Sequence, residues 1–196
     1  MCPRSAEQFE QIKDERRRAL LRAARVVFGR KGFAAAKIAD VAAQAGISHG
    51  LVYHYYPEKE SLFAATIEAS AEGWATLVAA ARAQAGTPWD RLVYLCGRMI
   101  AGMREEPEHL LMTVHVYSED ASPGVRDVLR RLRQRVLGDL QALIQDGQRA
   151  GQVARGDPTA MTRALIAIVQ GLAINRLVEP EAALPPLDVV LRILKA

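Results

Sequence analysis

Cysteine is scarce in this sequence, whose 196 residues include two, Cys2 and Cys96, that stand far apart. Two isolated thiols make neither a disulfide framework nor a metal-binding cluster, since both need several cysteines at short spacing. Cys96 lies among apolar residues, as a small core residue would. With 50% hydrophobic residues, the chain has enough apolar side chains to build a core without such cross-links.

Other signals are missing too. No uninterrupted apolar run reaches the length of about 20 residues that a membrane helix needs, and no apolar stretch follows the charges near the N-terminus, as it would in a secretory signal. We therefore expect a cytoplasmic protein with no membrane partner. The sequence has no glycine-rich phosphate loop and no nucleophile motif, so it predicts no catalytic residue, no metal and no cofactor.

Apolar residues recur at helical spacing along the whole chain, without strand-like alternation, internal repeats or low-complexity linkers. Prolines and cap residues mark several helix starts. These starts are Pro57, Thr87-Pro88, Pro107, Ser122-Pro123 and Asp157-Pro158. The pattern predicts an all-α fold of about nine helices.

Residues 37–56 predict two very short helices joined at one glycine. The apolar face of the first consists of Ile38, Val41, Ala42 and Ala45. Gly46 can take the left-handed conformation that ends this helix, and Ser48 is a good N-cap for the second. Two short helices around such a turn are typical of a helix-turn-helix motif.

The second short helix has two different faces. Its inward positions are Val52, Tyr55 and Tyr56, and its outward positions are His49, Gly50, Tyr53 and His54, with Leu51 at the edge. Pro57 stops it within about two turns, a length that suits insertion into a groove. Histidine, glycine and tyrosine can meet phosphates and base edges, so this face indicates a helix presented to the major groove of DNA.

A series of spaced positions around this motif carries a family resemblance. They are Arg17, Leu20, Leu21, Ala24, Phe28, Gly32, Phe33, Ile38, Ala39, Asp40, Val41, Ala42, Ala45, Gly46, Ile47, Ser48, Gly50, Val52, Tyr53, Tyr56, Pro57, Lys59, Leu62 and Phe63. This pattern closely resembles the N-terminal domain of the TetR family of bacterial transcriptional regulators. The resemblance implies a three-helix helix-turn-helix DNA-binding domain followed by a larger helical domain for ligand binding and dimerisation.

On this basis we divide the chain at residue 57. Residues 1–57 form the N-terminal tail and DNA-binding domain, with its core at 14–57 and its motif at 37–56, and residues 58–196 form the ligand-binding and dimerisation domain. We expect contacts with double-stranded DNA from Lys37, Ser48, His49, Gly50, Leu51, Tyr53, His54 and Lys59. Residues 1–60 hold 11 Lys and Arg against 7 Asp and Glu, so all of the net charge of +4 lies in this N-terminal segment, which includes the DNA-binding domain. Phosphate attraction favours such a bias.

Three departures from the usual family pattern bear on these contacts. Ala36 and Lys37 stand where the family usually has threonine and then serine or threonine, so a hydroxyl N-cap is missing and Lys37 offers charge to a phosphate instead. His49 stands where a lysine is common. Leu51 replaces a serine or threonine, and it can pack against a thymine methyl but cannot hydrogen-bond.

The second domain is expected to bind an apolar or aromatic small molecule as effector, because methionine and aromatic side chains suit a variable apolar ligand. The candidate ligand-binding residues are Trp74, Met99, Met103, Met112, His115 and Tyr117. The last two helices carry the candidate homodimer interface, Leu165, Ile168, Val169, Leu172, Leu191 and Leu194. Ordinary core packing is the alternative for both sets.

The leading hypothesis is a ligand-responsive regulator, a repressor that binds a palindromic operator as a homodimer and is released by its effector. A constitutive or partner-gated DNA-binding regulator without a small-molecule ligand uses the same residues. A helical metal-dependent enzyme is the remote alternative. Its candidate ligand pairs are Glu105 with His109 and His115 with Glu119, each at i, i+4 and without a third ligand at diagnostic spacing.

Overall fold

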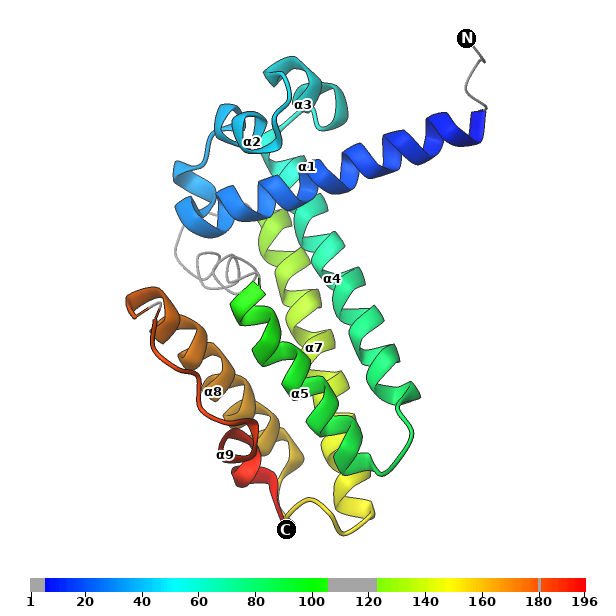
Figure 1. The fold of residues 1–196 in the computed structure, drawn as a ribbon, viewed down its shortest axis with the longest axis vertical. Helices are drawn as coiled ribbons and strands as arrows, with labels where there is room; N and C mark the ends of the chain where they lie inside the picture. Colours follow the sequence, from blue (N-terminus) through cyan, green and yellow to red (C-terminus); the bar gives the residue numbers. More distant parts are fainter. Residues whose placement is uncertain (1–5, 106–122, 180) are drawn as a thin grey trace. The chain divides into compact units, whose positions relative to one another are not determined.

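The computed structural model describes residues 6–105, 123–179 and 181–196, and these ranges contain eight α-helices, one short 3-10 helix and no strand (Figure 1). The α-helices are α1 (Ala6–Ala35), α2 (Ile38–Ala45), α3 (His49–Tyr55), α4 (Lys59–Ala83), α5 (Pro88–Glu105), α7 (Pro123–Arg149), α8 (Pro158–Val178) and α9 (Leu187–Leu191), and η1 (Arg192–Leu194) is the 3-10 helix. This confirms the predicted all-α class. The helix expected to start at Pro107 lies outside the described residues. Within them, no helix is both long and apolar enough to cross a membrane.

Side-chain caps set several helix starts at the predicted residues. The amide of Thr87 donates to Asp90 Oδ2 at 2.8 Å, and the amide of Asp90 donates back to Thr87 Oγ1 at 3.3 Å, which makes a capping box at the start of α5. The bond from the Thr87 amide, followed by a bond from the Thr87 hydroxyl to the same carboxylate oxygen, holds the pKa of Asp90 below its usual value of 3.8. At α8, the Asp157 carboxylate accepts from the amides of Thr159 and Ala160.

The structure falls into two compact units, whose described parts are residues 6–69 with 123–129, and residues 70–105 with 130–179 and 181–196. The division falls inside α4 and α7, so each of these helices belongs partly to both units. The division of function that we placed at residue 57 stays a prediction.

In the first unit, α1, α2, α3 and the start of α4 share an aromatic and aliphatic core. Phe28 and Phe63 are fully buried and meet edge to face, with ring centroids 4.9 Å apart. Val41 of α2 and Val52 of α3 have no exposed surface. Buried residues thus fix both short helices in this core: Ile38, Val41 and Ala42 of α2, and Val52 of α3.

In the second unit, the later parts of α4 and α7 pack with α5, α8, α9 and η1 around one core. Its fully buried members include Leu92, Leu95, Cys96, Leu140, Leu143, Ile144, Leu165 and Leu194. Burial raises the pKa of the Cys96 thiol to about 12. Cys96 is therefore the core residue that its apolar surroundings predicted, and Cys2 lies outside the described residues.

Candidate nucleic-acid interface

The turn between α2 and α3 has the predicted geometry. Gly46 takes φ 66° and ψ 32°, the left-handed conformation, and the amide of Ile47 donates to Ala42 O at 3.1 Å. The Ser48 hydroxyl oxygen accepts from the amide of Leu51 at 3.2 Å, so Ser48 is the N-cap of α3. Tyr56, which precedes Pro57, is extended and ends the helix. The result is an α3 of seven residues.

The two faces of α3 are as expected. Val52 and Tyr56 are buried and Tyr55 is half-buried, whereas the outward residues His49, Gly50, Tyr53 and His54 are exposed and Leu51 is half-exposed. Tyr53 is one of few large hydrophobic side chains that stay exposed in the described residues, at 43%. The outer face of α3 therefore carries aromatic and imidazole groups that the chain's own packing does not use.

His49 and Tyr53 form a pair on this face. Their rings lie edge to face, with centroids 4.9 Å apart and planes at 79°. An imidazole nitrogen and a phenolic hydroxyl can each donate or accept a hydrogen bond. Both groups are one turn apart and can reach neighbouring base edges or phosphates, which suits readout in a major groove.

The start of α2 is capped by a carboxylate, because the hydroxyl cap that is usual in the family is missing. Asp40 Oδ2 accepts from the amide of Lys37 at 3.0 Å, and Lys31 Nζ lies 2.9 Å from the other carboxylate oxygen. The bond from Lys31, followed by the bond from Lys37, holds the pKa of Asp40 below its usual value of 3.8. The Lys37 side chain itself is exposed, as a phosphate contact requires.

Lys59 has partners in the first unit that the sequence did not indicate. Its ammonium donates to the carbonyl oxygens of Phe33 at 2.9 Å, Ala34 at 3.2 Å and Ala36 at 3.2 Å. All three N–H donors of a lysine are thus used inside the protein. The role of Lys59 as a DNA contact stays a prediction.

Sequence reasoning missed one contact that supports α3. Arg17 Nε donates to the hydroxyl oxygen of Tyr56 at 3.0 Å, although the two residues are 39 positions apart. Tyr56 is the C-cap of α3, so this bond ties the end of α3 to α1. The residues were both in the family pattern, but no local spacing could have paired them.

The predicted ligand-binding residues are described only in part. Trp74 and Met99 are half-buried against the core of the second unit, and Trp74 Nε1 donates to Asp139 Oδ2 at 2.9 Å. Asp139 on α7 is a partner that the sequence did not indicate. Met112, His115 and Tyr117, and the side chain of Met103, lie outside the described residues.

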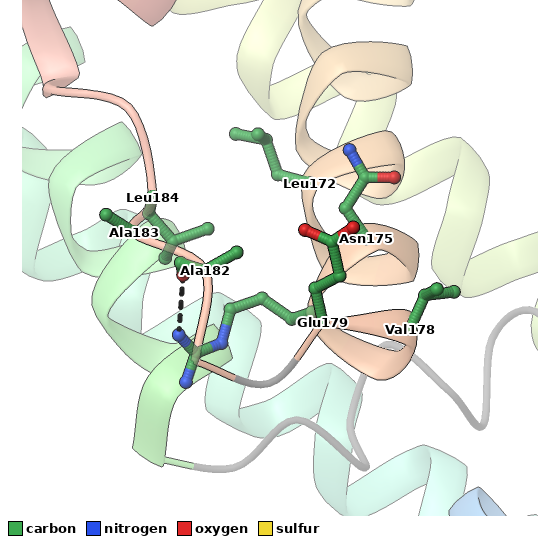
Figure 2. A pocket seen from close by; sticks show the side chains of 8 residues that line it. Leu172, Asn175, Val178, Glu179, Ala182, Ala183 and Leu184 are labelled. Atoms are coloured by element: carbon green, nitrogen blue, oxygen red, sulfur yellow. Dashed lines mark hydrogen bonds between the residues drawn. The ribbon is translucent and has the colours of Figure 1, made fainter.

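A surface pocket of about 270 Å³ lies elsewhere in the second unit, where the end of α8 meets the segment before α9. Figure 2 shows its lining: Leu172, Asn175, Arg176, Val178, Glu179, Ala182, Ala183 and Leu184. The Arg176 guanidinium donates to Ala182 O at 3.3 Å across it. Neither Trp74 nor Met99 lines this pocket, so it is not the ligand site that we predicted.

Four of the six predicted interface residues need correction. Leu165, Val169, Leu191 and Leu194 are at most 2% exposed within one chain, so they have no surface left for a second copy. Ile168 and Leu172 are half-buried against the same core. Helical spacing could not tell an inward from an outward apolar position on helices that are apolar on several sides. The placement of the interface on these helices stays a prediction.

The metal pairs of the remote alternative, Glu105 with His109 and His115 with Glu119, involve side chains outside the described residues. Among the side chains that are described, no group of three His, Cys, Asp or Glu could hold a metal ion.

The two short helices around Gly46, with the outer face of α3 exposed, define a helix-turn-helix motif of the kind found in DNA-binding regulators. Two family models match the chain: "Bacterial regulatory proteins, tetR family" over residues 20–66, and "BetI-type transcriptional repressor, C-terminal" over residues 88–196. The second match covers more than half of the sequence. The chain belongs to the TetR family of bacterial transcriptional regulators.

Individual relatives agree with this assignment. The HTH-type transcriptional regulator BetI of Rhizobium meliloti (strain 1021) is 35% identical over 133 residues, which are 65% of this chain and 66% of the relative. That match spans slightly less than two thirds of the relative. AibR, solved with isovaleryl coenzyme A and operator DNA, has a TM-score of 0.72 at 16% identity over 89% of this chain and 93% of its own. FadR of Bacillus subtilis, solved with stearoyl-CoA, has a TM-score of 0.72 at 14% identity over 89% and 95%. The two structures share the fold.

Proposed function

We propose that this regulator is a repressor that binds a palindromic operator as a homodimer and is released by an apolar or aromatic small molecule. The observation that carries the proposal is the outer face of α3, where His49, Gly50, Tyr53 and His54 are exposed together. A helix of seven residues is about 10 Å long. The major groove is about 12 Å wide, so it admits such a helix either end-on or lengthwise.

A second copy is needed because one helix of this length reads few base pairs. Two copies related by a two-fold axis would place their α3 helices one DNA turn apart, roughly 34 Å, which is why we expect the operator to be palindromic. Exposed large hydrophobic residues on the last helices support an interface there. They are Ile174 and Val178 of α8, Val189 of α9 and Ile193 of η1, between 43% and 76% exposed.

The half-buried Trp74 and Met99 support an apolar effector. The indole ring of Trp74 is held by Asp139, and Met99 is an adaptable side chain against the same core. Two proteins of the same fold were solved with acyl-CoA ligands, which carry apolar chains. An effector weakens DNA binding tenfold if it favours the non-binding state by about 1.4 kcal/mol.

Fluorescence anisotropy tests the DNA part. The labelled duplex comes from the region upstream of the protein's own gene, and a shuffled duplex of equal composition is the control. We expect at least about 10³-fold tighter binding to the first, and a steep loss of affinity as salt increases. Equal affinity for both duplexes would contradict the proposal.

The effector part is tested on the preformed complex. We expect at least one member of a panel of straight-chain acyl-CoA thioesters and neutral aromatic compounds to release the duplex. Trp74→Phe, which removes the bond to Asp139, should weaken that response but leave DNA affinity unchanged. A panel without any effect, on a complex that is otherwise sequence-specific, would favour a regulator without a small-molecule ligand.

A further inference from the structure

The outer face of α3 carries no permanent positive charge. The helix contains neither lysine nor arginine. Its two groups that become cationic near neutral pH are the imidazoles of His49 and His54, and both are exposed. A helix that we propose to enter the groove of a polyanion therefore depends on two titratable side chains for its charge.

The two histidines lie at opposite borders of the outer face. They are five positions apart, which on an α-helix is a rotation of about 140°. The exposed residues Gly50 and Tyr53 lie between them. When such a face enters the major groove, its middle meets base edges and its borders meet the sugar–phosphate backbones on either side. Each imidazole is therefore placed to meet a phosphate.

No charged group of the protein pairs with either imidazole among the described residues. The neighbours of the two rings are aromatic: Tyr53 lies 4.9 Å from His49 and Tyr55 lies 5.7 Å from His54, between ring centroids. The segments that precede, follow or contact α3 carry the charged residues Arg17, Lys37, Asp40, Glu58, Lys59 and Glu60. Three of these have other partners, since Arg17 bonds to Tyr56, Asp40 to Lys31, and Lys59 to backbone carbonyls. Both imidazoles are thus available to a phosphate.

The protonation state decides what an exposed imidazole offers to DNA. A neutral imidazole has one N–H donor and one acceptor, whereas an imidazolium has two donors and a positive charge. Phosphate oxygens only accept, so they bind the imidazolium more tightly. Linkage is reciprocal: if DNA favours the form that carries the proton, then a proton on the imidazole favours DNA binding by the same factor.

We infer that DNA binding by this regulator is coupled to proton uptake at His49 and His54, which as imidazolium groups supply the positive charge that α3 otherwise lacks. The inference rests on the proposed DNA binding. A free imidazole is about three-quarters protonated at pH 6 and roughly 3% protonated at pH 8. Each histidine can therefore increase affinity by up to about 25-fold between pH 8 and pH 6, the limit in which only the imidazolium binds.

Two double variants separate this coupling from other effects of pH. The first, His49→Gln with His54→Gln, keeps hydrogen-bonding groups at both positions but cannot take up a proton. The second, His49→Lys with His54→Lys, carries the positive charge at every pH of the series. Both positions are exposed, so we expect both variants to fold, and circular dichroism at pH 6 and pH 8 checks this.

Affinity for the specific duplex is measured at pH 6, 7 and 8 between 50 and 200 mM salt. We expect wild type to bind at least about fivefold more tightly at pH 6 than at pH 8. The slope of log affinity against log salt should be steeper at pH 6 by up to about 0.9 for each histidine that neutralises a phosphate. The glutamine variant should keep the wild-type slope of pH 8 throughout, and the lysine variant should keep that of pH 6.

Three results would each overturn the inference. The first is wild-type affinity that does not change with pH. The second is a pH dependence that persists in the glutamine variant, which would assign it to other groups such as His109 or His115. The third is a wild-type salt slope that is equal at pH 6 and pH 8. If a double variant does not fold, the four single variants decide in the same way. Wild-type protein without sequence preference at any pH would refute the proposed function itself, which is a different result from any of these.

Discussion

The imidazole ring of His49 contacts the phenol ring of Tyr53 edge to face, one turn apart on the outer surface of α3. Aromatic pairs of this geometry contribute about 0.5–1.5 kcal/mol beyond the area they bury. Because the pair is exposed, this energy orders the two side chains without anchoring them in the core. The pair lies on the exposed face of a helix that has no arginine, lysine or glutamine of its own.

Substitution of Tyr53 tests this face directly. We expect Tyr53→Ala to weaken binding to the specific duplex by at least about tenfold, since it removes a base-reaching group and releases His49. Tyr53→Phe keeps the ring pair and should show how much the hydroxyl contributes. Thermal unfolding should change little, because Tyr53 is 43% exposed. Tyr94→Phe, in the second unit, is the control, and an equal effect of Tyr53→Ala and Tyr94→Phe on affinity would argue against this interface.

Alanine substitution at the two glycines of the motif should change the free energy of unfolding in opposite directions. A Cβ would meet no atom within 4 Å at either Gly46 or Gly50, so only backbone preference matters. Gly46 has φ +66°, and we expect Gly46→Ala to lower the free energy of unfolding by about 1–2 kcal/mol. Gly50 is helical, and Gly50→Ala should raise it by about 0.5–1 kcal/mol. Urea titration measures both, and a destabilising Gly50→Ala would show that the fold needs this glycine.

Substitution of Gly50 should also weaken DNA binding. The fold gains no stability from a glycine at this exposed position. We therefore interpret its missing side chain as leaving room for DNA to approach the backbone of α3 closely. Gly50→Ala should therefore bind the specific duplex more weakly although it is more stable. Wild-type affinity in this variant would remove Gly50 from the contact surface.

Local features of the motif were predictable because they depend on neighbours in sequence. Gly46, Ser48 and Pro57 each act on residues within one helical turn, and Val52 follows from helical periodicity. The hydrogen bonds of Lys59 were not predictable, since its three carbonyl partners lie 23–26 positions earlier, where α1 ends. The bond between Arg17 and Tyr56 was not predictable either, because it joins residues 39 positions apart.

The same limit explains the interface residues. Helices α8 and α9 carry apolar residues on more than one side, so the period marks them as helices without telling which side faces the core. Leu165 and Val178 look alike in sequence, yet one is fully buried and the other is 76% exposed.

The Asp40 cap predicts a dependence of stability on pH. The pKa of Asp40 lies below 3.8, chiefly because of the bond from Lys31 and then the bond from the Lys37 amide. A carboxyl with a lowered pKa contributes stability above its ordinary pKa, and that contribution is lost as the pH falls through the lower value. We expect wild type to exceed Asp40→Asn in unfolding free energy at pH 7, and the gap to close as the pH falls below 3.8.

A matched control for that series is Asp188→Asn. Its partner Arg192 is 3.7 Å away and both side chains are 74% exposed, so this pair should contribute little at any pH. If the gap between wild type and Asp40→Asn stayed constant down to about pH 2, the carboxylate charge would not be what stabilises the start of α2.

The exposed residues of α8 provide the last test, which separates interface from core. Val178→Glu places a charge on the most exposed large hydrophobic side chain among the described residues, and we expect it to shift the protein to the mass of one chain in light scattering, with unchanged helicity. Leu165→Ala, on the buried side of the same helix, should instead lower the unfolding free energy by about 2–5 kcal/mol and leave the dimer intact. Arg131→Glu, a charge reversal on the exposed surface of α7, controls for charge alone. Because a palindromic operator is read by two copies together, Val178→Glu should also lose most of its specific affinity while its single α3 stays folded. A Val178→Glu protein that remained dimeric would place the two-fold interface on another surface.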